Sequence, residues 1–384
     1  MKEILMISSM YPFPQRCGFT VRLGDMCKHL SEIFQITLIV TDTSKLQTHS
    51  DIFKKVYFLP EKKRYQSLNK RLYHHFIPPY FDDPYYISDS FLHKLNSIFS
   101  RSNFDICMIH TPKFARVLKN LPNNIFKVID THDIWYHKYK EFDKIGYGKL
   151  LSHFRNEKKE LRLYRNMDLV IGISLFDYEY LKGNGISNCV YAPVSFLANP
   201  IYDPKRFDHS ILYPAGRGPN NEDAIHFFIT KILPRVRREA PSVKFKILNP
   251  SDKLKTQYKS TPNVEFLPFQ NRISDAYKQA DIVVIPLRVK SGLKIKLLES
   301  FAFAMPVILS SETSQGVCLK DYPQKGYSLY DSSFTNELIK ALKSEEYRKN
   351  LSIKGLEIIK RHYSAEKVYS ELIKKLNKSP GGQK

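Results

Sequence analysis

The sequence predicts an α/β protein made of two domains, each built around a parallel β-sheet. Short apolar runs rich in valine and isoleucine, typical of strands buried on both faces, alternate with amphipathic segments of helical period. Residues 280–311 show this most clearly, with a strand at 281–287, a glycine turn, a helix at 296–304 and a strand at 307–309. This order is that of a parallel sheet. A chain of 384 residues is long for one hydrophobic core and sufficient for two.

In the first 200 residues the sequence predicts six buried strands, with a helix at 19–32 after the first of them. The loop before this helix has no G-x-G-x-x-G pattern, so a dinucleotide site has little support. Ser174 is placed to cap the helix that follows its strand. Residues 61–89 are irregular and rich in proline, aromatic and basic residues, as in a surface excursion. The strands are expected at 3–9, 34–41, 104–109, 126–129, 168–174 and 190–194.

The second half begins after a linker at 196–209, so we place the domain boundary near residue 200. The turn Gly216-Arg217-Gly218-Pro219 leads into a helix for which Asn220 or Asn221 would be the N-cap. This helix start, with Arg217 in the turn, suits an anion. Besides the elements of 280–311, we expect strands at 212–215, 244–248 and 264–267 and helices at 271–279, 334–344, 345–361 and 365–377.

Composition and charge limit the class of protein. The chain is 42% hydrophobic and 26% charged, as globular proteins are, and no apolar run approaches the ~20 residues of a membrane helix. The start leads directly into a strand and lacks a signal-peptide cleavage pattern, so we expect a soluble, cytoplasmic protein. The five cysteines are scattered without a C-x-x-C pair, which indicates neither a disulfide framework nor a zinc site.

The formal net charge of +22 indicates attraction to polyanions such as a membrane surface, an acidic glycan or nucleic acid. A composition rich in lysine also raises the charge without any such partner. The basic segment 137–165 carries interleaved apolar residues, and it predicts an amphipathic helix. Such a helix either rests on an anionic bilayer, at the inner face of the plasma membrane, or simply exposes its lysines to water.

Polar, titratable residues follow the predicted strand 126–129, in the string DTHDIWYHKY. Asp130, His132 and Asp133 come just past the carboxyl end of this strand, where open α/β sheets bind ligands. A histidine beside carboxylates can exchange protons near neutral pH. A hydrogen-bonded loop histidine would fit the pattern equally well.

The polar residues of 280–311 suit a ligand that carries phosphate and sugar. Ser291 and Gly292 lie at the turn from strand to helix, where backbone N–H groups are free and the helix dipole favours an anion. Lys294 and Lys296 add positive charge, and Glu299 is placed to accept hydrogen bonds from ribose hydroxyls. The pattern alone fits an ordinary buried βαβ unit with solvated lysines as well.

The string SGLKIKLLESFAFAMPV resembles the donor-site motif of the family 4 glycosyltransferases (glycosyl transferases group 1), which have the GT-B architecture of two Rossmann-like domains facing across a cleft. The resemblance implies that Lys296 contacts the donor diphosphate and Glu299 the nucleotide ribose. Many members carry a second glutamate where this chain has Ser291, so the resemblance leaves the stereochemistry, retaining or inverting, open.

The resemblance assigns further residues by position. Arg217 would join Lys296 on the diphosphate, and Gly18 and Gly316 would allow close approach of the donor. His132 would lie near the transferred sugar, with Asp133 as the second candidate for the base. Residues 61–89 would lie on the acceptor side. The domains would be 1–200 for the acceptor, 201–361 for the donor, a helix at 362–378 packing back on the first domain, and a disordered tail at 379–384.

The function implied is a glycosyltransferase of the hexosyltransferase type, acting in cell-surface polysaccharide or lipopolysaccharide biosynthesis. The donor would be a UDP- or GDP-linked sugar and the acceptor a glycan or a lipid-linked sugar. No D-x-D motif occurs, so we expect no metal and no other cofactor. Two alternatives stay open. A nucleotide-sugar epimerase has the same fold, and a polyanion-binding protein would explain the charge, although no nucleic-acid-binding module is present.

Overall fold

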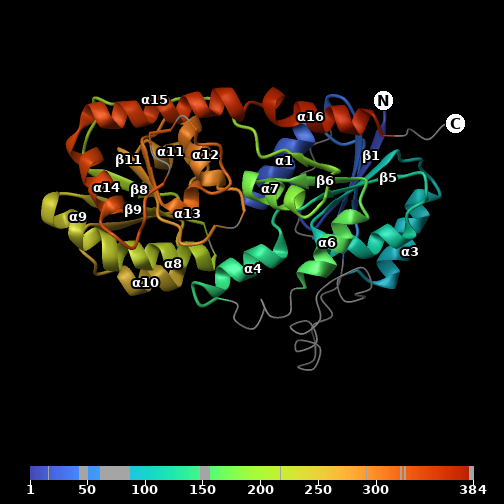
Figure 1. Ribbon diagram of the computed structural model, residues 1–384, viewed down its shortest axis with the longest axis horizontal. Coiled ribbons are helices and arrows are strands. Elements are labelled where there is room, and N and C mark those ends of the chain that lie inside the picture. The colour runs from blue at the N-terminus through green and yellow to red at the C-terminus, as the bar shows by residue number, and fades with distance from the viewer. Residues whose placement is uncertain are drawn as a thin grey trace.

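The computed structural model contains two α/β domains, each with one parallel sheet (Figure 1). It describes residues 1–379 except 16, 43–50, 61–86, 148–155, 217, 291, 321 and 324–325. The predicted α/β class with two parallel sheets is confirmed. None of the helices in the described part of the chain combines the length and the apolar character needed to cross a membrane.

The first sheet has seven parallel strands in the order β3-β2-β1-β4-β5-β6-β7. Its direction of growth changes between β1 and β4, and open α/β sheets bind ligands beyond the carboxyl ends of the strands at such a point. The strands are β1 (Glu3–Ser8), β2 (Gln35–Val40), β3 (Lys55–Phe58), β4 (Ile106–His110), β5 (Phe126–Asp130), β6 (Leu169–Gly172) and β7 (Cys189–Tyr191).

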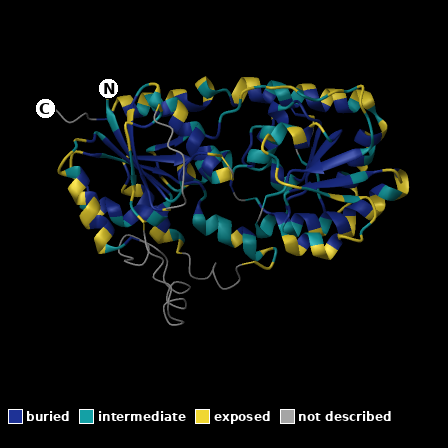
Figure 2. Cartoon of the chain, turned by 180° about the vertical axis from the view of Figure 1, so that it is seen from behind, coloured by how far each residue is buried: buried dark blue, intermediate teal, exposed yellow. Residues whose placement is uncertain are grey.

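Helices and apolar side chains cover both faces of this sheet. Leu5 and Ile7 of β1 pack on one side and Ile4 and Met6 on the other, because successive residues of a strand point to opposite faces. The central strands are therefore mostly apolar, and most of their residues are buried (Figure 2). The helices of this domain are α1 (Gly18–Ser31), α3 (Asp89–Phe99), the 3₁₀ helix η1 (Pro112–Asn120), α4 (Trp135–Asp143), α6 (Glu157–Arg165) and α7 (Leu175–Gly183).

The second sheet has the order β10-β9-β8-β11-β12, also parallel. Its direction changes between β8 and β11, so the turns after these two strands lie together. The strands are β8 (Ser210–Tyr213), β9 (Lys244–Leu248), β10 (Val264–Leu267), β11 (Ile282–Ile285) and β12 (Val307–Leu309). The helices are α8 (Pro219–Phe227), the π-helix η2 (Phe228–Ile232), α9 (Leu233–Glu239), α10 (Asp252–Tyr258), α11 (Ile273–Tyr277), α12 (Ile295–Ala302), α13 (Ser311–Ser314), α14 (Ser333–Lys343), α15 (Glu345–His362) and α16 (Ala365–Asn377).

The last two helices span both domains. α15 packs on α12 of the second domain, and α16 packs on α1 and β7 of the first (Figure 1). Val368, Tyr369, Leu372 and Leu376 of α16 belong to the core of the first domain. The chain thus passes between the domains twice, once in the segment after β7 and once at Tyr363 between α15 and α16.

Two local predictions are wrong. The segment 137–165 is not one helix, because α4 ends at Asp143 and the following turn contains Gly146 at φ +79°, a conformation that interrupts a helix. The N-cap of α8 is Gly218 and not an asparagine, because Pro219 occupies the first helical position, to which its fixed φ and missing N–H are suited. The prediction that Ser174 caps the next helix is confirmed, since its side chain accepts from Asp177 N.

Candidate functional site

The second domain places Lys296 at the start of α8. The ammonium group donates to Tyr213 Oη at 3.2 Å and to Asn221 Oδ1, and it lies 4.6 Å from the centre of the Tyr213 ring. Asn221 belongs to the first turn of α8, so the lysine stands beside a helix start whose N–H groups attract anions. Two chain segments about 75 residues apart, the turns after β8 and β11, thus form one positively charged corner.

The electrostatics of this corner favour an anionic ligand. Both partners of Lys296 are neutral, and no carboxylate of the described chain forms an ion pair with it. Burial and the charge of Lys294 lower the pKa of Lys296 to about 7, and Glu299 only partly offsets them. An incoming diphosphate would supply the missing negative charge.

Glu299 lies one turn further along α12. Tyr277 donates its hydroxyl to Glu299 Oε1 at 2.8 Å, and this fixes the carboxylate on the side of α12 that faces α11. Burial raises the pKa of Glu299, against the hydrogen bond from Tyr277 and the charge of Lys296. A half-buried carboxylate with one oxygen held, and the other without a partner among the described residues, can accept from the hydroxyls of a sugar.

Three glycines bring the two domains into contact. A β-carbon at Gly292 would lie 2.4 Å from Asp133 Oδ1, one at Gly316 would lie 3.1 Å from the β-carbon of Ser174, and one at Gly18 would lie 3.2 Å from Ile295 Cδ1. The backbone is joined as well, since Leu175 N donates to the carbonyl of Gly316 at 3.1 Å. The turns predicted to hold the donor therefore touch the loops after β5 and β6.

Lys294 faces the first domain. Its side chain is 5% exposed, and the nearest acidic groups that act on it are Asp133, Asp177 and Glu141. Burial still prevails over these charges and lowers the pKa of Lys294 to about 8. Glu141 also accepts a hydrogen bond from the backbone N of Lys290 at 3.0 Å. The acidic groups of the first domain therefore interact with the turn after β11 in two ways, with the side chain of Lys294 and with the backbone of Lys290.

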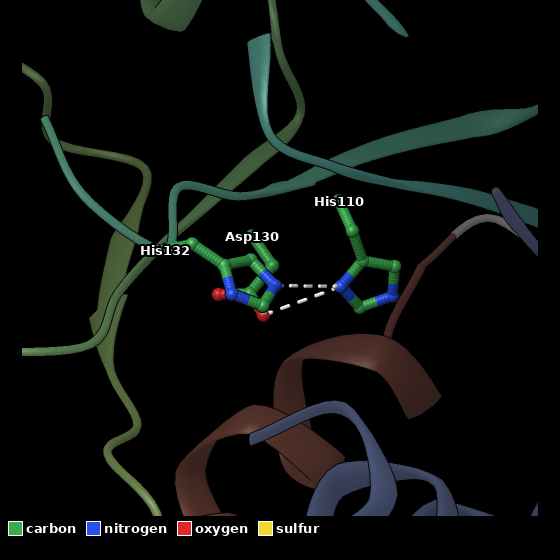
Figure 3. A group of neighbouring side chains, drawn as sticks. All are labelled: His110, Asp130 and His132. Atoms are coloured by element: carbon green, nitrogen blue, oxygen red, sulfur yellow. Dashed lines mark hydrogen bonds and ion pairs between the residues drawn. The ribbon is translucent and has the colours of Figure 1, made fainter. Parts of the chain in front are cut away.

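His132 lies just past the carboxyl end of β5, and its ring lies beside Asp130 and His110 (Figure 3). Asp133 N donates to the carbonyl of Thr131 at 2.6 Å, which forces His132 to φ +54°. Such a γ-turn is costly for a residue with a side chain, and strained positions of this kind occur most often at functional sites. The imidazole stacks on Phe19 of α1 with 4.2 Å between ring centres, next to Gly18.

Asp130 and His110 complete the cluster. The Nε2 atom of His132 lies 3.2 Å from Asp130 Oδ2, and His110 Nδ1 lies 3.3 Å from both of these atoms. Arg22 of α1 binds the same carboxylate, with Nε 3.2 Å from Oδ2 and Nη2 3.4 Å from Oδ1. Burial alone would raise the pKa of Asp130, but Arg22 and the two histidines outweigh it and hold the pKa well below its ordinary value.

The same three groups are the described residues that could hold a metal ion. Their ligand atoms form a triangle with sides of 3.2–3.3 Å, which fits a first-row divalent ion. Arg22 already neutralises the carboxylate, and a second cation about 2 Å from Oδ2 would be repelled by the guanidinium. The arrangement suits hydrogen bonding better than metal binding.

The structure brings together Gly18, His132 and Asp133 from the first domain and Gly292, Lys294, Lys296, Glu299 and Gly316 from the second. Arg217 and Ser291 lie outside the described residues, as does the acceptor-side region over 61–86. The sequence did not predict four residues of the site, Arg22, His110, Tyr213 and Tyr277. It also did not predict that Asn221 is a hydrogen-bond partner of Lys296. Isolated residues of helices and strands carry no local signal, and only the fold collects them.

Comparisons with known proteins agree with this geometry. Residues 209–344 match the family described as Glycosyl transferases group 1. Among solved structures, the chain is similar to sucrose-phosphate synthase from Thermosynechococcus elongatus, with a TM-score of 0.74 and 15% identity over 97% of this chain and 98% of the other. It is also similar to HepE from Anabaena, solved with UDP and glucose, with a TM-score of 0.68 and 12% identity over 98% and 100% of the two chains.

A protein from Klebsiella pneumoniae, named an uncharacterized 44.6 kDa protein in the cps region, is 21% identical over 97% of this chain and 100% of its own length. The fold shared with the solved structures and the site at the facing loops define the class as the GT-B proteins. Most of the second domain is thus similar to the Glycosyl transferases group 1 family, and the whole chain has the GT-B fold.

Proposed function

We propose that the protein transfers a hexose from a nucleotide-diphosphate sugar to a glycan or lipid-linked acceptor, in the biosynthesis of a cell-surface polysaccharide. The observation that carries this proposal is the position of Lys296, a partly buried ammonium without an anionic partner in the described chain, beside the start of α8. Glu299 lies one turn further along α12, where it could accept hydrogen bonds from the ribose of a nucleotide.

In the proposed reaction the second domain holds the leaving group. Lys296 and the helix start would stabilise the negative charge that develops on the nucleoside diphosphate as the bond to the sugar breaks. Arg217 is proposed to join them. Asp133 and His132 stand at the contact between the domains, where the sugar and the acceptor hydroxyl would meet, and His132 can exchange a proton or hydrogen-bond the sugar.

A thermal-shift screen of nucleoside diphosphates and nucleotide sugars tests the donor class. A donor at ~100-fold excess over its dissociation constant should add about 2.7 kcal/mol to the free energy of unfolding. UDP and GDP with their hexose derivatives are the first candidates, and neighbours of the fold were solved with UDP-glucose or UDP. Absence of a shift with every nucleotide would refute the proposal. If the protein converts a nucleotide sugar into its epimer without any acceptor, the reaction is epimerisation and not transfer.

The acceptor class is proposed from charge and from the cps region in which the K. pneumoniae relative is described. A net charge of +22 and the exposed Lys158, Lys159, Arg162 and Arg165 of α6 favour an anionic or lipid-linked acceptor at the inner face of the plasma membrane. Flotation with anionic liposomes should show binding that is lost as salt is raised, because exposed charges are screened. Equal binding to neutral liposomes would contradict this version of the proposal.

We also propose that transfer needs no metal. Activity should persist after dialysis against a chelator, and the purified protein should contain less than stoichiometric zinc. Retention of one zinc ion per chain, lost on His110→Ala, would instead assign the buried cluster to a metal site.

A further inference from the structure

A single buried guanidinium joins three parts of the chain behind the candidate site. Arg22 of α1 is 1% exposed and binds both oxygens of Asp130 at the end of β5. Its Nη1 donates to the carbonyl of Pro193, in the segment that leaves the first domain, and reaches the hydroxyl of Tyr369 of α16 at 3.5 Å. Three segments distant in sequence therefore meet at one side chain.

Asp25, one turn further along α1 than Arg22, binds the same tyrosine, Tyr369. Its carboxylate accepts from Tyr369 Oη at 2.6 Å and from both the backbone N and the Oγ of Ser195 at 2.7 Å. Burial opposes its ionisation, but the hydrogen bonds from His29, Tyr369 and Ser195 lower the pKa of Asp25. Two charged residues of α1 thus hold Tyr369, and one of them also holds Asp130.

Asp130 in turn decides which nitrogen of His132 carries the proton. The carboxylate is ionised and is the strongest acceptor that Nε2 can reach, at 3.2 Å, so the neutral ring keeps its proton on Nε2. The 3.3 Å between His132 Nε2 and His110 Nδ1 follows because both N–H groups point at the same oxygen. Nδ1 of His132 has no hydrogen-bond partner among the described residues and keeps its lone pair.

The exposed fractions of the three side chains show which of them reaches the boundary between the domains. His110 and Asp130 are completely buried, whereas His132 is 9% exposed and is the one member of the cluster that reaches the surface, where Asp133 meets Gly292. His110 stays neutral, because burial lowers its pKa against the pull of Asp130. Arg22 pairs with the charge of Asp130, and Nδ1 of His132 is the ring nitrogen left for a ligand.

We propose that Asp130 is a positioning residue of the transfer reaction, that it presents His132 with Nδ1 towards the substrate, and that Arg22 and Tyr369 make the C-terminal helix α16 part of this support. The inference rests on the proposed function for its kinetic consequence, whereas the tautomer of His132 can be measured without any substrate. A helix about 240 residues away in the sequence thereby contributes to the geometry of the candidate catalytic histidine.

Nitrogen-15 NMR of histidine-labelled protein tests the tautomer, with His132→Gln assigning the resonances. The native ring should be protonated on Nε2. In Asp130→Asn, whose side chain has the same shape but no charge, the proton should redistribute to Nδ1. A native ring protonated on Nδ1, or a tautomer unchanged in Asp130→Asn, would overturn the inference.

Kinetics give the second readout. Asp130→Asn should lower kcat by about 100-fold, the lower end of what proton transfer by a positioned group contributes, with the KM for the donor changed less than about twofold because the diphosphate is held in the second domain. Tyr369→Phe should lower kcat by about two- to tenfold through one lost hydrogen bond. Equal kcat in the native protein and both variants would refute the proposal, as would a rise in donor KM without a fall in kcat.

Tyr363→Phe is the matched control for Tyr369→Phe. Tyr363 is buried at the same passage between domains, and its hydroxyl contacts Tyr191 and Cys318 N but not the Arg22 corner. It should leave both kcat and the tautomer unchanged, and a loss equal to that of Tyr369→Phe would assign the effect to general packing and overturn the role of Tyr369. If the native protein binds no nucleotide sugar, the proposed function fails, and the tautomer measurement still decides the role of Asp130.

Discussion

Gly292 and Asp133 touch across the boundary between the domains. An ideal β-carbon on Gly292 would lie 2.4 Å from Asp133 Oδ1, closer than real β-carbons approach any atom. A side chain at this position would have to displace the Asp133 carboxylate, and the φ of +69° also favours glycine. Asp133 Oδ2 accepts from Lys138 Nζ at 2.6 Å, so a shift of the carboxylate would disturb this ion pair.

Gly292→Ala should hold the two loops apart and lower kcat by about 10- to 100-fold, since a misplacement of about 1 Å at a reacting centre is enough for such a loss. Gly185→Ala is the control. Gly185 has φ +76°, close to the +69° of Gly292, but a β-carbon there would meet no atom within 4 Å. Both variants carry the same backbone strain, about 1–2 kcal/mol. Equal kcat values for the two variants would show that the contact with Asp133 has no part in activity.

Lys296→Met should abolish the thermal shift produced by the donor and at the same time raise the melting temperature of the free protein. The pKa of Lys296 is about 7 in the folded chain, lowered from the ordinary value of 10.5 that a lysine has when the chain is unfolded. At pH 7–8 the unfolded chain therefore binds more protons, and burial of the charge destabilises the folded state. Removing the charge removes this cost. Lys278→Met, which changes an exposed lysine of the same domain, should alter neither quantity. A donor shift retained in Lys296→Met would disprove the assignment.

Donor binding should take up protons above neutral pH. The free protein loses the proton of Lys296 at a pKa of about 7, and a diphosphate favours the charged form and so raises this pKa in the complex. At a pH of about 8.5 binding should therefore take up close to one proton, and affinity should fall as the pH rises above about 7. Calorimetry in buffers of different ionisation enthalpy measures this number. Uptake that is the same in Lys296→Met would place the titrating group elsewhere.

Glu299→Gln should weaken binding of the preferred nucleoside diphosphate by about 10- to 100-fold, because hydrogen bonds to a charged acceptor contribute about 1.5–3 kcal/mol. Binding of inorganic pyrophosphate should not weaken, since it lacks the ribose. Glu265→Gln, at an exposed glutamate of β10, serves as control. If Glu299→Gln weakens the binding of the nucleotide and of pyrophosphate alike, Glu299 acts on the phosphate site at Lys296 and not on a ribose.

The fold could be predicted from the sequence because its strands are buried on both faces. Runs such as Ile282–Ile285 are short, continuous and rich in β-branched residues, and their length and composition favour a strand over a helix without tertiary information. Elements with weaker patterns were not predicted. The strand β3 has only partly buried or exposed residues, and the 3₁₀ helix η1 has no period of 3.6. The two helices α4 and α6 were joined in the prediction because the apolar spacing continues across Gly146.

The candidate site could be predicted only where its residues cluster in the chain. Lys294, Lys296 and Glu299 share one turn and helix start, and His132 and Asp133 share one loop, so both groups are visible in the sequence. Arg22 and Tyr369 are single polar residues of amphipathic helices, and nothing in their neighbourhood distinguishes them from exposed positions. Their burial depends on the order of the strands and on the path of α16.

The path of α16 also limits how the protein can move. The two passages of the chain between the domains are fastened to each other, since Phe196 N donates to the carbonyl of Tyr363 at 2.8 Å. We expect a molecule joined at one such point to open by rotation of the domains about that point. The separation of the two domains would then be smallest beside Tyr363 and largest at the edge farthest from it.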